Sequence, residues 1–145
     1  MPLRADRSRA AAIFIAALAF VVAACGGPSQ QARECTARGS ADEAAFAQHF
    51  SEMDFASGRA PTGEGGQEFG PSEPVVVAAV AKASVGTRFC AQERGRLGTV
   101  GHDQEHALPA GESSINLGAF QKKGNYVVRV SVGGVLVRNL TFTVR

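Results

Sequence analysis

The feature that most constrains the fold is a pattern of alternating side chains near the C-terminus, interrupted by two glycines. In residues 126–132 (YVVRVSV), one face carries the large apolar side chains, namely Tyr126, Val128, Val130 and Val132. A period of two is that of a half-buried β-strand. Gly133 and Gly134 can both take positive φ without steric cost. Residues 135–144 follow, and their inward side chains are Leu140, Phe142 and Val144. The pattern therefore predicts a β-hairpin.

Shorter apolar segments upstream predict further strands. The valine-rich run over 74–83 (PVVVAAVAKA) has strand length, and a second strand is expected over 87–92. Alternation predicts another strand over 114–120, and a weak one near 97–100. Because no strand alternates with a helix, the sequence predicts an all-β fold, an antiparallel sandwich of two sheets with about six to seven strands.

One short helix is expected before these strands. Ser40 and Glu43 fit the S-x-x-E capping box, and apolar side chains follow at helical spacing, so a helix is predicted over about 41–50. In the competing interpretation, Met53 and Phe55 already belong to the first strand. A helix followed by a strand accommodates both patterns.

The N-terminal segment has the layout of a secretory signal. Residues 10–24 are uninterrupted apolar residues, preceded by three arginines and ended by two small residues, Ala23 and Ala24. This run is shorter than the roughly 20 residues that cross the hydrocarbon core as a helix. We therefore expect residues 1–24 to be a removable signal peptide rather than a permanent transmembrane anchor.

The end of this segment resembles the lipobox of bacterial lipoproteins, in the residues Val22-Ala23-Ala24-Cys25. The resemblance implies that Cys25 becomes the new N-terminus and carries lipid, which makes the membrane a partner of the chain. The alternative is an ordinary signal cleaved nearby, with Cys25 a plain thiol. Gly26 stands where an aspartate often signals inner-membrane retention, which favours the outer membrane if the organism has one.

The chain is then expected to comprise a signal peptide (1–24), a flexible polar tether (25–40) and one folded domain (41–145). Removal of the signal peptide takes away three arginines and one aspartate, which leaves 12 of the 15 basic and 12 of the 13 acidic residues. The mature net charge is near zero, and no basic cluster remains. We therefore expect no nucleic-acid partner.

Two further cysteines, Cys35 and Cys90, remain if Cys25 is acylated. A pair of cysteines in an oxidising compartment favours a disulfide, which would attach the tether to the domain. The alternative is two separate thiols, buried or free.

The C-terminal hairpin, residues 124–137 (GNYVVRVSVGGVLV) with 140–144 (LTFTV), resembles the last hairpin of immunoglobulin-like domains in secreted bacterial proteins. The segment from Gly58 to Phe69, with the valine-rich strand, is also similar to small domains of that kind, so the resemblance spans roughly 53–145. The chain departs from the usual pattern because it has no tryptophan. The resemblance implies a fold and transfers no functional residues.

One stretch, residues 102–106 (HDQEH), carries several side chains that could bind a metal ion. On a helix, His102 and His106 would share a face as in the zinc protease motif, but that motif needs glutamate where Asp103 stands. The flanking glycine and proline favour a solvated loop.

On an extended strand, His102, Gln104 and His106 would face one way, which leaves too few ligands unless His49 joined them. His102 and His106 are therefore only weak metal candidates, and neither a metal nor a cofactor is expected.

Other patterns give no catalytic site. Ser113 and Ser114 lack the G-x-S-x-G elbow, and Cys90 is expected to be structural. The glycines over 63–66 lack the strand, helix and lysine that a phosphate-binding loop needs. The chain is therefore expected not to be an enzyme.

The sequence thus predicts a membrane-anchored envelope lipoprotein that acts as a binding or adaptor module for an unidentified partner. Its expected contact surface is formed by long loops over 57–73 and 93–113. The alternatives are an inhibitor of a secreted protease and a metal-dependent enzyme that uses His102 and His106.

Overall fold

A computed structural model describes residues 34–95 and 99–145 of the 145-residue chain. The expected signal peptide, Cys25 and part of the expected strand near 97–100 lie outside the described residues. The elements are α1 (Glu43–His49), β1 (Phe50–Phe55), β2 (Gln67–Phe69), β3 (Pro74–Ala81), β4 (Val85–Glu93), β5 (Val100–Leu108), β6 (Gly111–Ala119), β7 (Gly124–Val132) and β8 (Val135–Val144).

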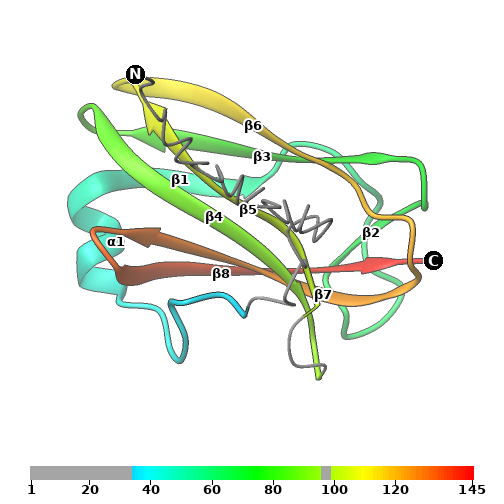
Figure 1. The fold of residues 1–145 in the computed structure, drawn as a ribbon. Helices are drawn as coiled ribbons and strands as arrows, with labels where there is room; N and C mark the ends of the chain where they lie inside the picture. The colour runs from blue at the N-terminus through cyan, green and yellow to red at the C-terminus, as the bar shows by residue number, and fades with distance from the viewer. Residues whose placement is uncertain (1–33, 96–98) are drawn as a thin grey trace, which may run out of the picture.

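The strands form an all-β sandwich of two sheets. One sheet has the order β1-β3-β6 and the other the order β2-β8-β7-β4-β5. Figure 1 shows the β7–β8 turn at the same end of the sandwich as α1, with the C-terminus at the opposite end. Within the described residues, no helix has the length and apolar character needed to cross a membrane.

The predicted C-terminal hairpin is confirmed. Strands β7 and β8 pair antiparallel, with Tyr126 opposite Phe142 and Val128 opposite Leu140. The turn between them consists of two glycines with φ values of 56° and 84°. Both values lie in the left-handed region that favours glycine.

The strand order follows the Greek-key pattern of immunoglobulin-type sandwiches, because β4 pairs with β7 and β3 with β6. The hydroxyl of Tyr126, near the start of β7, donates a hydrogen bond to the carbonyl oxygen of Lys122 at 2.8 Å. A tyrosine that bonds back to the backbone a few residues upstream is a recurrent feature of these folds.

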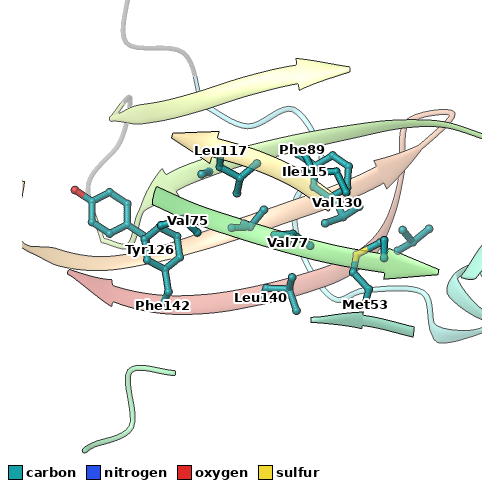
Figure 2. Packing of buried hydrophobic residues seen from close by; sticks show 14 of the residues in the cluster. Met53, Val75, Val77, Phe89, Ile115, Leu117, Tyr126, Val130, Leu140 and Phe142 are labelled. Atoms are coloured by element: carbon teal, nitrogen blue, oxygen red, sulfur yellow. The ribbon is translucent and has the colours of Figure 1, made fainter. Parts of the chain in front are cut away.

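The core lies between the two sheets, where side chains of β3 and β6 meet those of β4, β7 and β8 (Figure 2). Tyr126 and Phe142 lie next to each other in this cluster, with ring centroids 5.0 Å apart. Several of its side chains are fully buried, among them Phe69, Val75, Val77, Phe89, Val128, Val130 and Phe142. The packed interior leaves the outward faces and the loops for binding.

The predicted helix is present, but its start differs from the expected one. The N-cap is Asp42, whose side chain accepts a hydrogen bond from the backbone N–H of Ala45 at 2.9 Å. The expected capping box at Ser40 is therefore wrong. Strand β1 follows the helix directly and includes Met53 and Phe55, so the helix and the competing strand pattern both occur.

The strand count and the strand directions need a correction. Eight strands occur in the described residues, rather than six to seven, and β2 pairs in parallel with β8. The sandwich is thus mixed rather than wholly antiparallel. Strand β2 lies inside the segment 57–73 that was expected to be a loop; it has three residues, too few to show a period of two.

The expected loop over 93–113 is also wrong. Residues 100–108 form β5, an edge strand that pairs antiparallel with β4, and β6 begins at Gly111. The inward side of β5 carries polar residues because β6, at the edge of the opposite sheet, makes few contacts with it. Without apolar alternation, sequence analysis could not recognise this strand.

Residues 35–42, which we call the strap, lie on the five-stranded sheet. The strap is attached by the Cys35–Cys90 disulfide and by hydrogen bonds of its backbone with Arg129, Asn139 and Leu136. The disulfide is the expected one, and Cys35 is buried. The described end of the expected tether is therefore fixed to the domain.

Candidate functional site

An open hollow of about 570 Å³ lies on the outer face of the five-stranded sheet, beside the strap. We call it the Arg129 hollow. It is lined by residues of β4, β7 and β8, by one strap residue and by the turn after β4, namely Gln92, Glu93, Val127, Arg129, Asn139, Thr141, Gly39, Arg94 and Gly95. Gly39 of the strap, which is fixed to this sheet, contributes to the wall of the hollow.

Two arginines give this hollow its polar character. Arg129 is half-buried, and its Nη1 donates a hydrogen bond to the carbonyl oxygen of Ala37 in the strap at 3.4 Å. Its Nε is buried and has no hydrogen-bond partner among the described residues. Arg94 is exposed at the rim. An arginine pair of this kind can hold carboxylates or other hydrogen-bond acceptors.

A second hollow of about 380 Å³ adjoins the first, and the two share Arg94. It lies where the loop over 57–66 meets the ends of β7 and β8, and its other lining residues are Glu64, Gly65, Asn125, Thr143 and Arg145. The two hollows together form one surface, the loop-end surface, from the sheet face to the loops at one end of the sandwich.

The loop over 57–66 is held against the domain by Glu68 of β2. The carboxylate of this buried residue accepts hydrogen bonds from the hydroxyl of Thr62 at 2.6 Å and from its backbone N–H at 3.1 Å. These hydrogen bonds are the main reason why the pKa of Glu68 lies below its ordinary value, and the charges of Arg145 and Arg59 add to them.

The second polar cluster is a histidine pair on the inward side of β5. The rings of His102 and His106 have centroids 6.0 Å apart and an interplanar angle of 11°. The rings of His106 and Phe89 are nearly perpendicular, with centroids 5.7 Å apart. The expectation of a solvated loop is thus wrong, and the alternative of an extended strand that aligns the histidines is what the structure shows.

The environment of His102 favours its neutral ring. Burial is the main cause that lowers the pKa of His102, and the neighbouring His106 adds to it. Asp103 and a backbone hydrogen bond at Leu117 of β6 act in the opposite direction.

The other members of the HDQEH stretch do not join the histidines. Asp103 lies on the outer face, where Arg88 of β4 binds it with two hydrogen bonds of 2.7 and 2.8 Å. Gln104 is exposed, and His49 lies at the end of α1. Across the described residues, no group of three or more histidine, cysteine, aspartate or glutamate side chains is placed to hold a metal ion.

Sequence analysis missed the Arg129 hollow. The outward position of Arg129 on its strand was visible from the alternation, but the strap that makes a hollow beside it depends on the path of the chain after Cys35. Cys90 lies in the disulfide and therefore offers no thiol nucleophile.

No known protein family matches the sequence, and no curated protein matches it either. Among solved structures, one similar chain is a β-glucosidase involved in saponin metabolism from intestinal bacteria, with 13% identity and a TM-score of 0.42. Another is a β-glucosidase from Listeria innocua, with 14% identity and a TM-score of 0.36. The matches cover 66% and 64% of this chain, but only 16% of each glucosidase.

Proposed function

We propose that this chain is a lipid-anchored protein of the cell envelope that works as a non-enzymatic binding module. In this proposal, Cys25 carries the lipid, and the loop-end surface contacts a protein or another envelope component. The observation that carries the proposal is the Arg129 hollow beside the strap. The strap connects the domain to the proposed anchor at Cys25, and it also contributes to the surface on which a partner would bind.

The strap supports the anchoring part of the proposal. Cys35 lies ten positions after Cys25, and a fully extended chain over that distance spans at most about 35 Å. The disulfide then transfers the attachment to β4, a strand with neighbours on both sides. A domain held in this way would stay close to the membrane and keep a restricted orientation.

The chemistry of the loop-end surface supports the binding part. The surface combines arginine, glutamate, asparagine and threonine side chains with the apolar Val127. A few polar groups around a small apolar area are typical of a recognition surface. Arg129 has a buried Nε without a partner among the described residues, and a bound acceptor group would satisfy an arginine in this position.

Site-specific photo-cross-linking in intact cells tests this proposal. A photoreactive residue replaces Arg94, which lines both hollows, and in a control chain it replaces Ser114, which is exposed on the outer face of β6. The proposal predicts a discrete adduct from position 94 that is absent from position 114. No adduct from position 94, or equal adducts from both positions, would contradict it.

A charge-reversal variant sharpens the result. With the photoreactive residue at Thr141, which lies in the Arg129 hollow, Arg94→Glu should reduce the adduct because it removes one of the two positive charges there. The matched control is Arg59→Glu, since Arg59 is exposed and lines neither hollow. An adduct that falls equally with both changes would show a general charge effect and count against a specific surface.

A further inference from the structure

Arg129 carries a positive charge that the described residues do not compensate. It is half-buried, and Cys90 of the disulfide lies directly opposite it on β4. Of its five N–H donors, one makes a hydrogen bond with a described residue, the 3.4 Å bond to the carbonyl oxygen of Ala37. No ion pair joins it to a described carboxylate. Because a charge removed from water is costly unless an opposite charge accompanies it, this arginine is suited to an anionic ligand.

The other charges around the Arg129 hollow leave it electropositive. Arg94, at the rim, also makes no ion pair within residues 34–95 and 99–145. Among the described lining residues, Glu93 is the one carboxylate, and it accepts a hydrogen bond from the ammonium group of Lys122 at 2.9 Å. Arg94 and Arg129 therefore bring two positive charges whose counter-charges are not in the lining. A hollow of this kind attracts negatively charged groups.

The register of the sheet sets the distance between the two arginines. On β7, Asn125 lies four residues before Arg129. The backbone N–H of Arg94 donates a hydrogen bond to the carbonyl oxygen of Asn125 at 2.8 Å, so Arg94 lies beside that position. Four residues of an antiparallel strand span about 14 Å, and the backbones of the two arginines are therefore about 14 Å apart. This separation favours a ligand with two separated negative groups over one small anion.

Neutral side chains lie between and beside the arginines. Thr141 of β8 is directly opposite Val127 of β7, which is two residues from Arg129, and Asn139 is opposite Arg129 itself. Amide and hydroxyl groups beside a small apolar side chain suit the polar backbone of a bound peptide. In an extended peptide, side chains on one side repeat about every 7 Å, so carboxylates four residues apart match the spacing of the two arginines.

We propose that the Arg129 hollow binds an extended acidic segment of a partner protein, with one carboxylate at Arg129 and a second at Arg94. This inference rests on the proposed binding function and specifies the chemistry of the partner. The concave shape favours a peptide over the flat headgroup layer of an anionic membrane, because Gly39 of the strap contributes to the wall of the hollow.

The test uses the full-length chain in a non-ionic detergent and a fluorescent peptide with blocked ends, in which two glutamates stand four residues apart among serines. The control peptide has glutamines in place of both glutamates. By fluorescence anisotropy, the glutamate peptide should bind at least about tenfold more tightly, because the control loses two charge-assisted contacts. A peptide with two adjacent glutamates should bind less tightly than the spaced one, and equal affinity of these two would contradict the two-point contact.

Three variants localise the contact. Arg129→Gln should weaken binding of the glutamate peptide about tenfold, and Arg94→Gln about threefold, since Arg94 is exposed and its charge is screened by solvent. Arg59→Gln is the matched control, because Arg59 is exposed and lines neither hollow, and it should bind as the unchanged chain does. If circular dichroism shows that Arg129→Gln is misfolded, Arg94→Gln and the comparison of the peptides decide the outcome.

Equal affinity for the glutamate and glutamine peptides would overturn the proposal, and so would equal losses in Arg94→Gln and Arg59→Gln. A third contrary result is a membrane ligand: in nanodiscs without peptide, the ¹⁵N signal of Arg129 Nε would then shift when phosphatidylglycerol replaces phosphatidylcholine. If any of these results is found while a photoreactive residue at position 94 still gives a discrete adduct, the proposed function stands and the acidic character of the partner is wrong.

Discussion

At the scale of single residues, Tyr126 links the core to the loop end of the sandwich. Its ring packs against Phe120 and Phe142, with centroids 5.1 and 5.0 Å away, and its hydroxyl binds the backbone of Lys122. It is the only tyrosine of the chain, which also contains no tryptophan. A spectroscopic signal from tyrosine therefore reports on this one position.

The pKa of Tyr126 gives a prediction with a definite sign. Burial, with a smaller contribution from the charge of Glu93, raises this pKa above its ordinary value of 10.0. The unfolded phenol therefore ionises first, and the stability that this group contributes is complete below about pH 10 and is lost as the pH rises through the folded-state pKa. Absorbance at 295 nm should show a higher midpoint for the folded chain than for the chain in guanidinium chloride. Equal midpoints would contradict the burial of this ring.

Alanine substitutions at two glycines with similar φ values distinguish the effect of a steric clash from that of backbone strain. Gly66 has a φ of 79°, and a Cβ there would lie 2.0 Å from the carbonyl oxygen of Thr141 in β8. Gly134 has a φ of 84° and nothing within 4 Å of such a Cβ. Gly66→Ala should therefore lower the free energy of unfolding by at least about 1 kcal/mol more than Gly134→Ala does. Urea unfolding followed by circular dichroism measures both, and equal effects would show that the loop over 57–66 is not packed on β8.

At the scale of elements, the disulfide that attaches the strap to β4 should contribute to the stability of the fold. It links residues 55 positions apart. In the chain-entropy description, closure of a loop of this length stabilises a fold by about 4 kcal/mol. The double variant Cys35→Ala and Cys90→Ala should therefore have a clearly lower melting temperature. Dithiothreitol should lower the melting temperature of the unchanged chain by a similar amount, and it should not change that of the variant. A variant with the same melting temperature as the unchanged chain would contradict a stabilising role of the disulfide.

Sequence analysis predicted the elements whose sequence signals lie within one short segment of the chain. The hairpin of β7 and β8 depends on the alternation over 126–132 and on two adjacent glycines, and both signals lie within one segment. The valine-rich strand β3 was predicted for the same reason. The start of α1 was misplaced by two residues because Ser40 and Asp42 can both cap a helix, and only the structure shows which side chain accepts the bond.

The two missed strands lack apolar alternation for different reasons. Strand β2 has three residues and exists because it pairs in parallel with β8, more than 70 positions further along the chain. Strand β5 pairs with β4, but its inward residues His102, Gln104 and His106 are polar, so it has the composition of a loop. A pattern based on apolar alternation cannot detect either strand.

At the scale of the whole molecule, the two sheets have unequal size, and this accounts for the position of the histidine pair. Within the described residues, three strands lie against five. The smaller sheet cannot cover the full width of the larger one, so the inward side of the edge strand β5 is only partly covered. Polar side chains such as His102 and His106 are half-buried there, whereas Phe89 and Ala91 of β4 and Val128 and Val130 of β7 are apolar and fully enclosed.

The sequence predicted one of the two candidate sites in part and did not predict the other. The shared face of His102 and His106 followed from the strand period once an extended conformation was considered. The Arg129 hollow did not, because it requires the strap, the sheet face and the turn after β4 to meet in space. Sites that combine distant segments need the fold before they can be recognised.

The central claim is that a lipid on Cys25 holds this binding module at the envelope. Intact-mass spectrometry of the native protein, extracted from washed membranes, tests it directly. We predict a chain that begins at Cys25 and carries the added mass of a diacylglyceryl group, and a Cys25→Ser variant that is absent from the membrane fraction. An unmodified thiol at position 25, or native protein found freely in the culture medium, would contradict the account.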